Sequence, residues 1–207
     1  MNNQPQFTQK EKKLIKSLNT PAKIQDFLNK LPFNFEKDGH DTIKSPLRTL
    51  REKNAHCFEG ALLGAYILSQ HGHTPLLLHL KTTSDDMDHV IAPFKINGLW
   101  GALSKTNHAV LRYRDPVYKN IRELVMSYFH EYFLYNGKKT LRQYSKPLDM
   151  RVFKKGWEVS VEDLWIVDEA LDRAKNFDIA PKNIIAKLRK ADILERKVGQ
   201  VEEYPKG

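Results

Sequence analysis

The sequence predicts an α+β domain in which a buried helix packs on an antiparallel sheet. Three observations support this class: an apolar stretch of helical spacing that starts near Cys57, two apolar runs joined by Asn97-Gly98, and a long amphipathic pattern after Asp115-Pro116. The first and third patterns have the length of helices, and Asn-Gly between two short apolar runs is the strongest local signal for a β-hairpin. Additional helices are expected at both ends of the chain.

The length of 207 residues suits one domain, residues 1–207, with a core large enough to need no disulfide. We expect a catalytic-like core at about 21–137 and a basic helical C-terminal extension at about 138–207. The chain has one cysteine, and its first residues, MNNQPQFTQKEKK, lack the apolar stretch of a signal peptide. A cytoplasmic location is therefore expected. Apolar runs such as Gly60 to Leu68 are far shorter than the ~20 residues that cross a bilayer, so no membrane association is expected.

The net charge of +9 comes from the two ends of the chain. Residues 1–56 contain 11 Lys and Arg against 6 Asp and Glu, and residues 57–137 contain 7 against 7. Residues 138–207 contain 16 against 12. A dispersed excess of this kind is typical of solvated lysine-rich helices, and specific nucleic-acid binding is not expected.

The first half of the chain reads as two short helices, a loop and a buried helix. Thr8 and Thr20-Pro21 each place a capping residue before apolar residues of helical spacing, and Pro32 to Pro46 is expected to be a loop. The apolar helix that starts near Cys57 is expected to stop at Gly72.

Gly60 and Gly64 lie four residues apart, on one face of the apolar helix. Each glycine costs about 1 kcal/mol of helix propensity, so their presence indicates close packing against another element. That neighbour is expected to be the sheet that follows.

The apolar runs after this helix predict three strands, at Pro75 to Leu80, His89 to Ile96, and Leu99 to Ser104. Asp115-Pro116 is expected to cap a long core helix that ends before Gly137.

The C-terminal part reads as one more strand and two helices. Leu148 to Phe153 predicts the strand, and Ser160 with Asp163 resembles a capping box for a helix through Ala174. Pro181 is expected to start a final basic helix.

Cys57 is the candidate nucleophile. A thiol reacts as the thiolate, and a helix N-terminus together with a nearby histidine lowers the pKa of a thiol. Cys57 stands at the predicted helix start, and His89 opens a strand after an acidic loop. The alternative for a lone cysteine is a buried structural role.

The segments NAHCFEGALLGAYILSQHG and DHVIAPFKINGLWGALS resemble the transglutaminase-like family of the papain-like cysteine enzyme superfamily, over roughly residues 21–108. The resemblance implies a papain-like fold with Cys57 as nucleophile, His89 as base, and an aspartate one strand further on that orients the histidine. The strand LWGALSKTN contains no carboxylate, and Ser104 falls near the place of the aspartate.

Strand geometry decides which neutral residue can orient His89. With a two-residue turn, Thr106 lies opposite His89, and the diagonal neighbour Ser104 points to the same face. A three-residue turn or a bulge would place Asn107 opposite His89 instead. We favour Ser104, with Asn107 as the alternative.

The resemblance implies a thiol-dependent acyl-transfer enzyme that acts on a protein or peptide through a thioester, as an amide hydrolase, a protease-like enzyme or a transamidase. No cofactor is expected. The alternative is a catalytically inactive member of this fold that binds a protein or nucleic acid, and the missing carboxylate supports that alternative.

A metal site is a second chemistry for the same region. Its ligands would be three aspartates next to His89 together with three earlier histidines, but these histidines lack a recognised ligand spacing. An acidic surface turn without metal is therefore expected. The residues concerned are Asp85, Asp86 and Asp88, and His71, His73 and His79.

Overall fold

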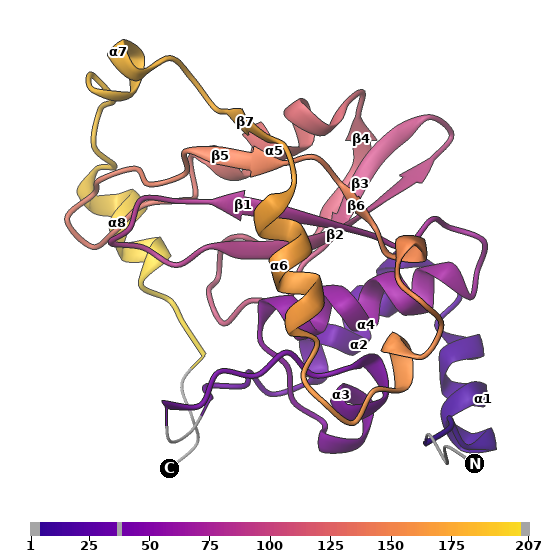
Figure 1. Ribbon diagram of the computed structural model, residues 1–207. Coiled ribbons are helices and arrows are strands. Elements are labelled where there is room, and N and C mark those ends of the chain that lie inside the picture. The colour runs from indigo at the N-terminus through magenta and orange to yellow at the C-terminus, as the bar shows by residue number, and fades with distance from the viewer. Residues whose placement is uncertain (1–4, 37–38, 204–207) are drawn as a thin grey trace.

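The computed structural model describes residues 5–36 and 39–203, and its elements are shown in Figure 1. Residues 1–4, and residues 37–38 of the predicted loop, lie outside this part of the chain. The helices are α1 (Gln9–Ser17), α2 (Pro21–Lys30), α3 (Pro46–Glu52), α4 (Cys57–Ser69), α5 (Ile121–Phe129), α6 (Trp165–Arg173), α7 (Lys182–Ile185) and α8 (Ile193–Gly199), with 3-10 turns η2 (Met150–Val152) and η3 (Trp157–Val159). The strands are β1 (Leu76–Lys81), β2 (His89–Ile96), β3 (Leu99–Leu103), β4 (Arg114–Tyr118), β5 (Gln143–Ser145), β6 (Leu148–Asp149) and β7 (Asn176–Asp178).

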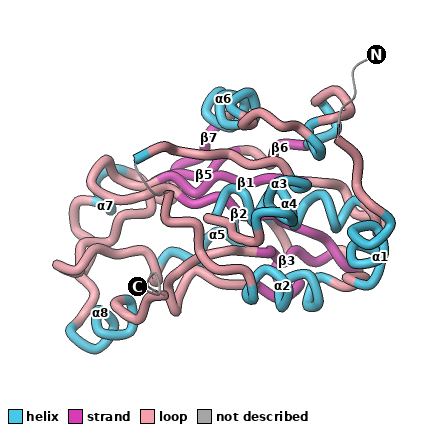
Figure 2. The backbone as a smooth tube through the Cα atoms, turned by 90° about the horizontal axis from the view of Figure 1, so that it is seen from below, coloured by secondary structure: helices cyan, strands magenta, loops and turns pink. Residues whose placement is uncertain are grey.

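The strands form one antiparallel sheet in the order β4-β3-β2-β1-β5-β7, with β6 beside β1. Side chains alternate between two cores: Leu77 and Leu103 face the core shared with α2, α4 and α6, whereas Leu78 and Ala102 face the core shared with α5. Helices α7 and α8 lie at one end of the sheet and α1 at the other (Figure 1, Figure 2). The predicted α+β class, with the Cys57 helix on an antiparallel sheet, is confirmed.

The predicted N-terminal caps are confirmed. Thr8 accepts from the Glu11 backbone N–H at 3.2 Å and forms a capping box with that residue, and Thr20 accepts from Lys23 N–H at 3.3 Å. No helix within residues 5–36 and 39–203 is both long and apolar enough to cross a bilayer.

The two glycines of α4 allow the close contact that the sequence predicts. A Cβ at Gly60 would lie 2.4 Å from the Lys105 Cβ, and one at Gly64 would lie 2.8 Å from Leu103 Cδ1. A side chain at Gly60 would push α4 away from the segment that follows β3, so the glycine allows the close approach of these two segments.

The hairpin also follows the prediction. Asn97 and Gly98 have φ values of 48° and 85°, which a two-residue turn of this kind requires. The register runs from Ile96 opposite Leu99 to Ala92 opposite Leu103 without a bulge. This register places Ser104 on the same face as His89.

The predicted start of the long core helix is wrong. Asp115 and Pro116 lie in the edge strand β4, and α5 begins after Asn120, whose side chain accepts from Glu123 N–H at 2.9 Å. An edge strand tolerates a proline because one row of its N–H groups has no partner strand. The helix ends at Phe129, well before Gly137.

The C-terminal part differs from its prediction in three places. Only Leu148–Asp149 of the predicted strand pairs in the sheet, and η2 follows it. The predicted capping box is wrong, because α6 begins five residues after Ser160 and the Asp163 carboxylate instead accepts from Ile43 N–H and pairs with Arg48, both at 2.9 Å. The predicted final helix is two short helices, α7 and α8. Residues 138–203 also contribute β5, β6 and β7 to the sheet, in addition to helices.

Candidate active site

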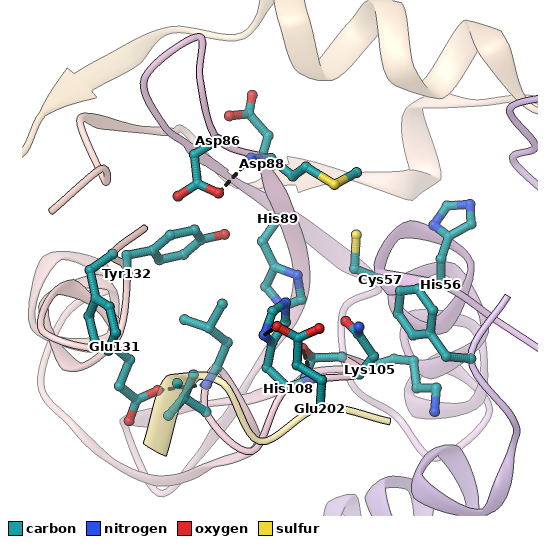
Figure 3. Close-up of a pocket in the computed structure, with 18 of the residues that line it drawn as sticks. His56, Cys57, Asp86, Asp88, His89, Lys105, His108, Glu131, Tyr132 and Glu202 are labelled. Carbon is teal, nitrogen blue, oxygen red and sulfur yellow. Dashed lines mark hydrogen bonds and ion pairs between the residues drawn. The ribbon is translucent and has the colours of Figure 1, made fainter. Parts of the chain in front are cut away.

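A cavity of about 530 Å³ opens at the N-terminus of α4. Its walls come from this helix end, residues 33–36 after α2, the start of β2 with the loop before it, the loop after β3, the loop after α5, and α8 with the segment after it. The structure brings Cys57 and His89 together in this cavity (Figure 3).

Cys57 is a free, partly buried thiol at the first position of α4. Burial raises the pKa of this thiol, but hydrogen bonding and positive charge from His56 and His89 outweigh burial. The pKa of Cys57 therefore lies well below its usual range. A group in this environment can exist as the thiolate near neutral pH.

The His89 ring has a fixed hydrogen-bond partner in Ser104. His89 Nε2 lies 2.8 Å from Ser104 Oγ, and both side chains are buried. Ser104 donates its single hydroxyl hydrogen to the Leu111 carbonyl at 2.5 Å. Because a serine has only one O–H, Ser104 must accept from the N–H on His89 Nε2. A neutral His89 then carries its lone pair on Nδ1, the ring nitrogen left for the thiol.

The backbone of Ser104 is held by Gln25, a buried residue of α2. The Gln25 amide donates to the Ser104 carbonyl at 2.8 Å and accepts from the Ser104 N–H at 3.0 Å. One hydrogen bond given and one accepted by the Gln25 side chain fix both the position and the rotation of the serine backbone.

The Leu111 carbonyl is aimed at Ser104 by an unusual backbone conformation. Leu111 has φ 60°, in the left-handed region that residues other than glycine rarely adopt. Its N–H donates to Glu131 Oε2 at 2.7 Å, and the same carboxylate pairs with Arg114 at 2.6 Å. The surrounding contacts therefore hold a strained residue that completes the Ser104 hydrogen bonds.

His56 is a functional candidate that the sequence reasoning missed. It is the N-cap of α4: its Nδ1 accepts from Phe58 N–H at 3.2 Å, its Nε2 lies 2.7 Å from the Thr42 carbonyl, and its backbone N–H donates to Glu59 at 3.1 Å. A glutamate three residues after the cap is the available sequence signal, although histidine is not a favoured capping residue.

Two states of His56 compete. The neutral ring accepts from Phe58 and caps the helix, whereas a protonated ring would give up that hydrogen bond. Burial lowers the pKa of His56, but hydrogen bonding and charge from Cys57, together with the Glu59 carboxylate, raise it to about 9. The ionised thiol therefore favours a cationic His56 beside it.

A buried polar cluster lies next to the N-terminus of α4. Glu59 is fully buried and accepts from Thr42 Oγ1 at 2.8 Å and from Lys44 N–H at 3.3 Å. The Lys44 ammonium lies 3.6 Å from the Glu59 carboxylate and also donates to Asn54. The cation offsets a negative charge that would otherwise disfavour the Cys57 thiolate.

Thr106 and Asn107 line the cavity, and the Thr106 hydroxyl and the Asn107 backbone carbonyl bond to other residues. Thr106 Oγ1 accepts from His108 N–H at 3.0 Å, and the Asn107 carbonyl accepts from Glu203 N–H at 2.7 Å. The hydrogen-bonding position next to His89 is occupied by Ser104.

The aspartates considered for a metal are engaged in separate contacts. Asp85 pairs with Lys138 at 2.7 Å, Asp86 accepts from Thr140, and Asp88 lies 3.0 Å from His79 Nε2. Within the part of the chain that the structure describes, no group of three His, Cys, Asp or Glu side chains could hold a metal ion.

No protein-family model matches the chain, and a search of curated proteins found no match. Among solved structures, the chain is similar to Legionella pneumophila LapG in an EGTA-treated form, with 19% sequence identity and a TM-score of 0.36. The match covers 44% of this chain and 57% of LapG. The chain thus matches little more than half the length of that protein.

Proposed function

We propose that this cavity is the active site of a thiol-dependent acyl-transfer enzyme, an amide hydrolase or transamidase that acts on a protein or peptide. Cys57 is the nucleophile, His89 is the general base, and Ser104 orients His89. The proposal rests on a chain of two hydrogen bonds: His89 Nε2–H donates to the Ser104 hydroxyl, and the Ser104 hydroxyl donates to the Leu111 carbonyl. This arrangement leaves His89 Nδ1 as the basic nitrogen beside a thiol of lowered pKa.

The reaction follows from these groups. His89 takes the proton of the Cys57 thiol, and the resulting thiolate attacks the substrate carbonyl carbon. The backbone N–H of Cys57, at the N-terminus of α4, stabilises the oxyanion. The C–N bond breaks as protonated His89 gives its proton to the leaving amine, which leaves a thioester on Cys57. His89 then takes a proton from water or from an acceptor amine, whose attack releases the thiol.

Ser104 replaces a carboxylate in this scheme, and the replacement has a chemical consequence. A hydroxyl fixes the histidine tautomer but does not stabilise the imidazolium as a charge would. Donation to the Leu111 carbonyl polarises the Ser104 oxygen and makes it a better acceptor for His89. His56, as a second positive group beside the thiol, supplies further stabilisation of the thiolate.

The missing carboxylate also supports the second candidate, a catalytically inactive fold that binds a protein or nucleic acid. The two candidates differ in whether Cys57 can be acylated.

The test uses p-nitrophenyl acetate as a generic activated acyl donor. We expect a burst of nitrophenolate and a mass increase of one acetyl group on Cys57, absent in Cys57→Ala and slowed in His89→Ala. Acetylation of the same extent in Cys57→Ala would place the label on other residues and would favour the inactive binding module.

A further inference from the structure

The segment that follows α8 lies along the rim of the cavity and pairs with the rim through an antiparallel β-bridge. Ala109 N–H donates to the Val201 carbonyl at 2.8 Å, and Glu203 N–H donates to the Asn107 carbonyl at 2.7 Å. His108 and Glu202 form the antiparallel bridge between these contacts. The backbone from 107 to 109 is therefore an edge that binds an extended peptide.

The two acidic side chains of this segment are each bound by the rim. The Glu202 carboxylate lies 3.3 Å from His108 Nδ1 and accepts from the Tyr135 hydroxyl at 3.0 Å. Its side chain is 11% exposed, which is low for a glutamate. The rim thus holds this carboxylate in a defined place.

Glu203 is recognised by a buried cation. Its carboxylate lies 3.9 Å from Lys105 Nζ and accepts from Phe33 N–H at 3.4 Å. The Lys105 side chain is only 2% exposed, and its ammonium donates to the Leu31 carbonyl at 2.6 Å. Burial lowers the pKa of Lys105, and the charge of Glu203 opposes that effect. A buried ammonium of this kind needs an anionic partner.

The cavity is divided by charge around the thiol site. Lys105 and His108 lie on one side of His89, where the Glu131 carboxylate is paired with Arg114, and Asp86 and Asp88 lie on the other side (Figure 3). An acidic ligand is therefore favoured on the side where Glu202 lies and disfavoured on the opposite side.

We propose that the edge formed by residues 105–109 is a subsite for an extended acidic segment of a protein, with two adjacent carboxylates read by His108 and Lys105. In this structure, Val201–Glu203 occupies the subsite as an intramolecular ligand, which an acidic substrate segment displaces. The inference rests on the proposed function, because it names the segment that would be presented beside Cys57. Main-chain pairing at the edge supplies affinity, and the two basic groups supply specificity.

The test measures binding of labelled peptides to the full chain by fluorescence anisotropy. The probe is Gly-Gln-Val-Glu-Glu, the sequence of residues 199–203, and the control peptide is Gly-Gln-Val-Gln-Gln. The variant Glu202→Ala/Glu203→Ala weakens the intramolecular ligand without adding positive charge. The matched control, Glu162→Ala/Glu169→Ala, removes two exposed carboxylates outside the cavity.

We expect the acidic peptide to bind the Glu202→Ala/Glu203→Ala chain about tenfold more tightly than the unmodified chain, because a tethered competitor acts at high effective concentration. The control variant should bind as the unmodified chain does, and His108→Ala in the Glu202→Ala/Glu203→Ala background should weaken binding several-fold.

Equal affinity for the acidic and glutamine peptides, or equal affinity of the unmodified and Glu202→Ala/Glu203→Ala chains, would overturn the inference. If p-nitrophenyl acetate acylates Cys57 but the acidic peptide does not bind, the acidic subsite is overturned and the proposed function stands. Binding of the acidic peptide by a chain whose thiol is inert would support the acidic subsite and overturn the proposed function.

Discussion

Replacing Ser104 by alanine removes the one hydroxyl that joins His89 to the backbone. The variant leaves the His89 Nε2–H without its acceptor at 2.8 Å and the Leu111 carbonyl without its donor. Both partners are buried, with His89 5% and Leu111 8% exposed. Water can therefore replace the lost hydroxyl only by entering a packed site.

Two effects follow. Loss of a buried hydrogen bond that leaves its partners unsatisfied costs about 1–3 kcal/mol, so the free energy of unfolding of Ser104→Ala should fall by about 2 kcal/mol. The His89 ring also loses the contact that fixes its tautomer and orientation. We expect the pKa of Cys57 to rise toward its ordinary value, which shifts the alkylation profile to higher pH and lowers the rate at low pH.

The assay is the rate of Cys57 alkylation by iodoacetamide as a function of pH, with urea denaturation measured in parallel. Ser145→Ala is the matched control, because Ser145 is buried and accepts from His79 N–H at 3.0 Å in the strand β5. It should lose similar stability and keep the pH profile of the unmodified chain. A Ser104→Ala profile identical to that of Ser145→Ala would refute the orienting role of Ser104.

Three further predictions concern the helix packing, the charged pair and the basic ends. Gly60→Ala should lower the urea midpoint by the equivalent of about 1–3 kcal/mol, because the new Cβ would lie 2.4 Å from the Lys105 Cβ; an unchanged midpoint would contradict the close contact. The raised pKa of His56 stabilises the fold fully below pH 6.5, and this contribution is lost as the pH rises through about 9. The lowered pKa of Cys57 stabilises the fold above pH 9, and this contribution is lost as the pH falls through the pKa of Cys57 in the folded state. The two contributions oppose each other in the unmodified chain, so its free energy of unfolding should change little between pH 6.5 and 9. That of His56→Ala should rise with pH over this range. Parallel pH curves of the two chains, measured by urea denaturation, would rule out the His56–Cys57 charge pair. Binding to nucleic acid should be weak and should vanish by about 200 mM salt, and a sequence-selective complex of sub-micromolar affinity at that salt would contradict the dispersed-charge interpretation.

Local chemistry made much of this architecture predictable. The Asn97-Gly98 turn has only one common geometry, so the strand register, and with it the placement of Ser104 on the His89 face, follows from counting residues. Gly60 and Gly64 signal a close helix contact because few other reasons offset their cost inside a helix.

The residues that complete the site depend on tertiary contacts that no local pattern encodes. Leu111 reaches Ser104 through a left-handed backbone conformation that is held by Glu131, twenty residues later in the chain. His56 was missed because capping by a histidine ring is uncommon. Asp115-Pro116 has the sequence of a helix start but lies in an edge strand, where pairing with β3 outweighs the local preference.

The central claim is that His89, together with His56, holds Cys57 as a thiolate, and the pH dependence of Cys57 alkylation tests the part of His89 most directly. The unmodified chain should react rapidly with iodoacetamide at about pH 6.5, where an ordinary thiol is protonated. His89→Ala should lose most of this low-pH reactivity while remaining folded by circular dichroism, and His73→Ala, which changes a histidine outside the cavity, should keep it. Equal alkylation rates at low pH in His89→Ala and the unmodified chain would contradict the claim.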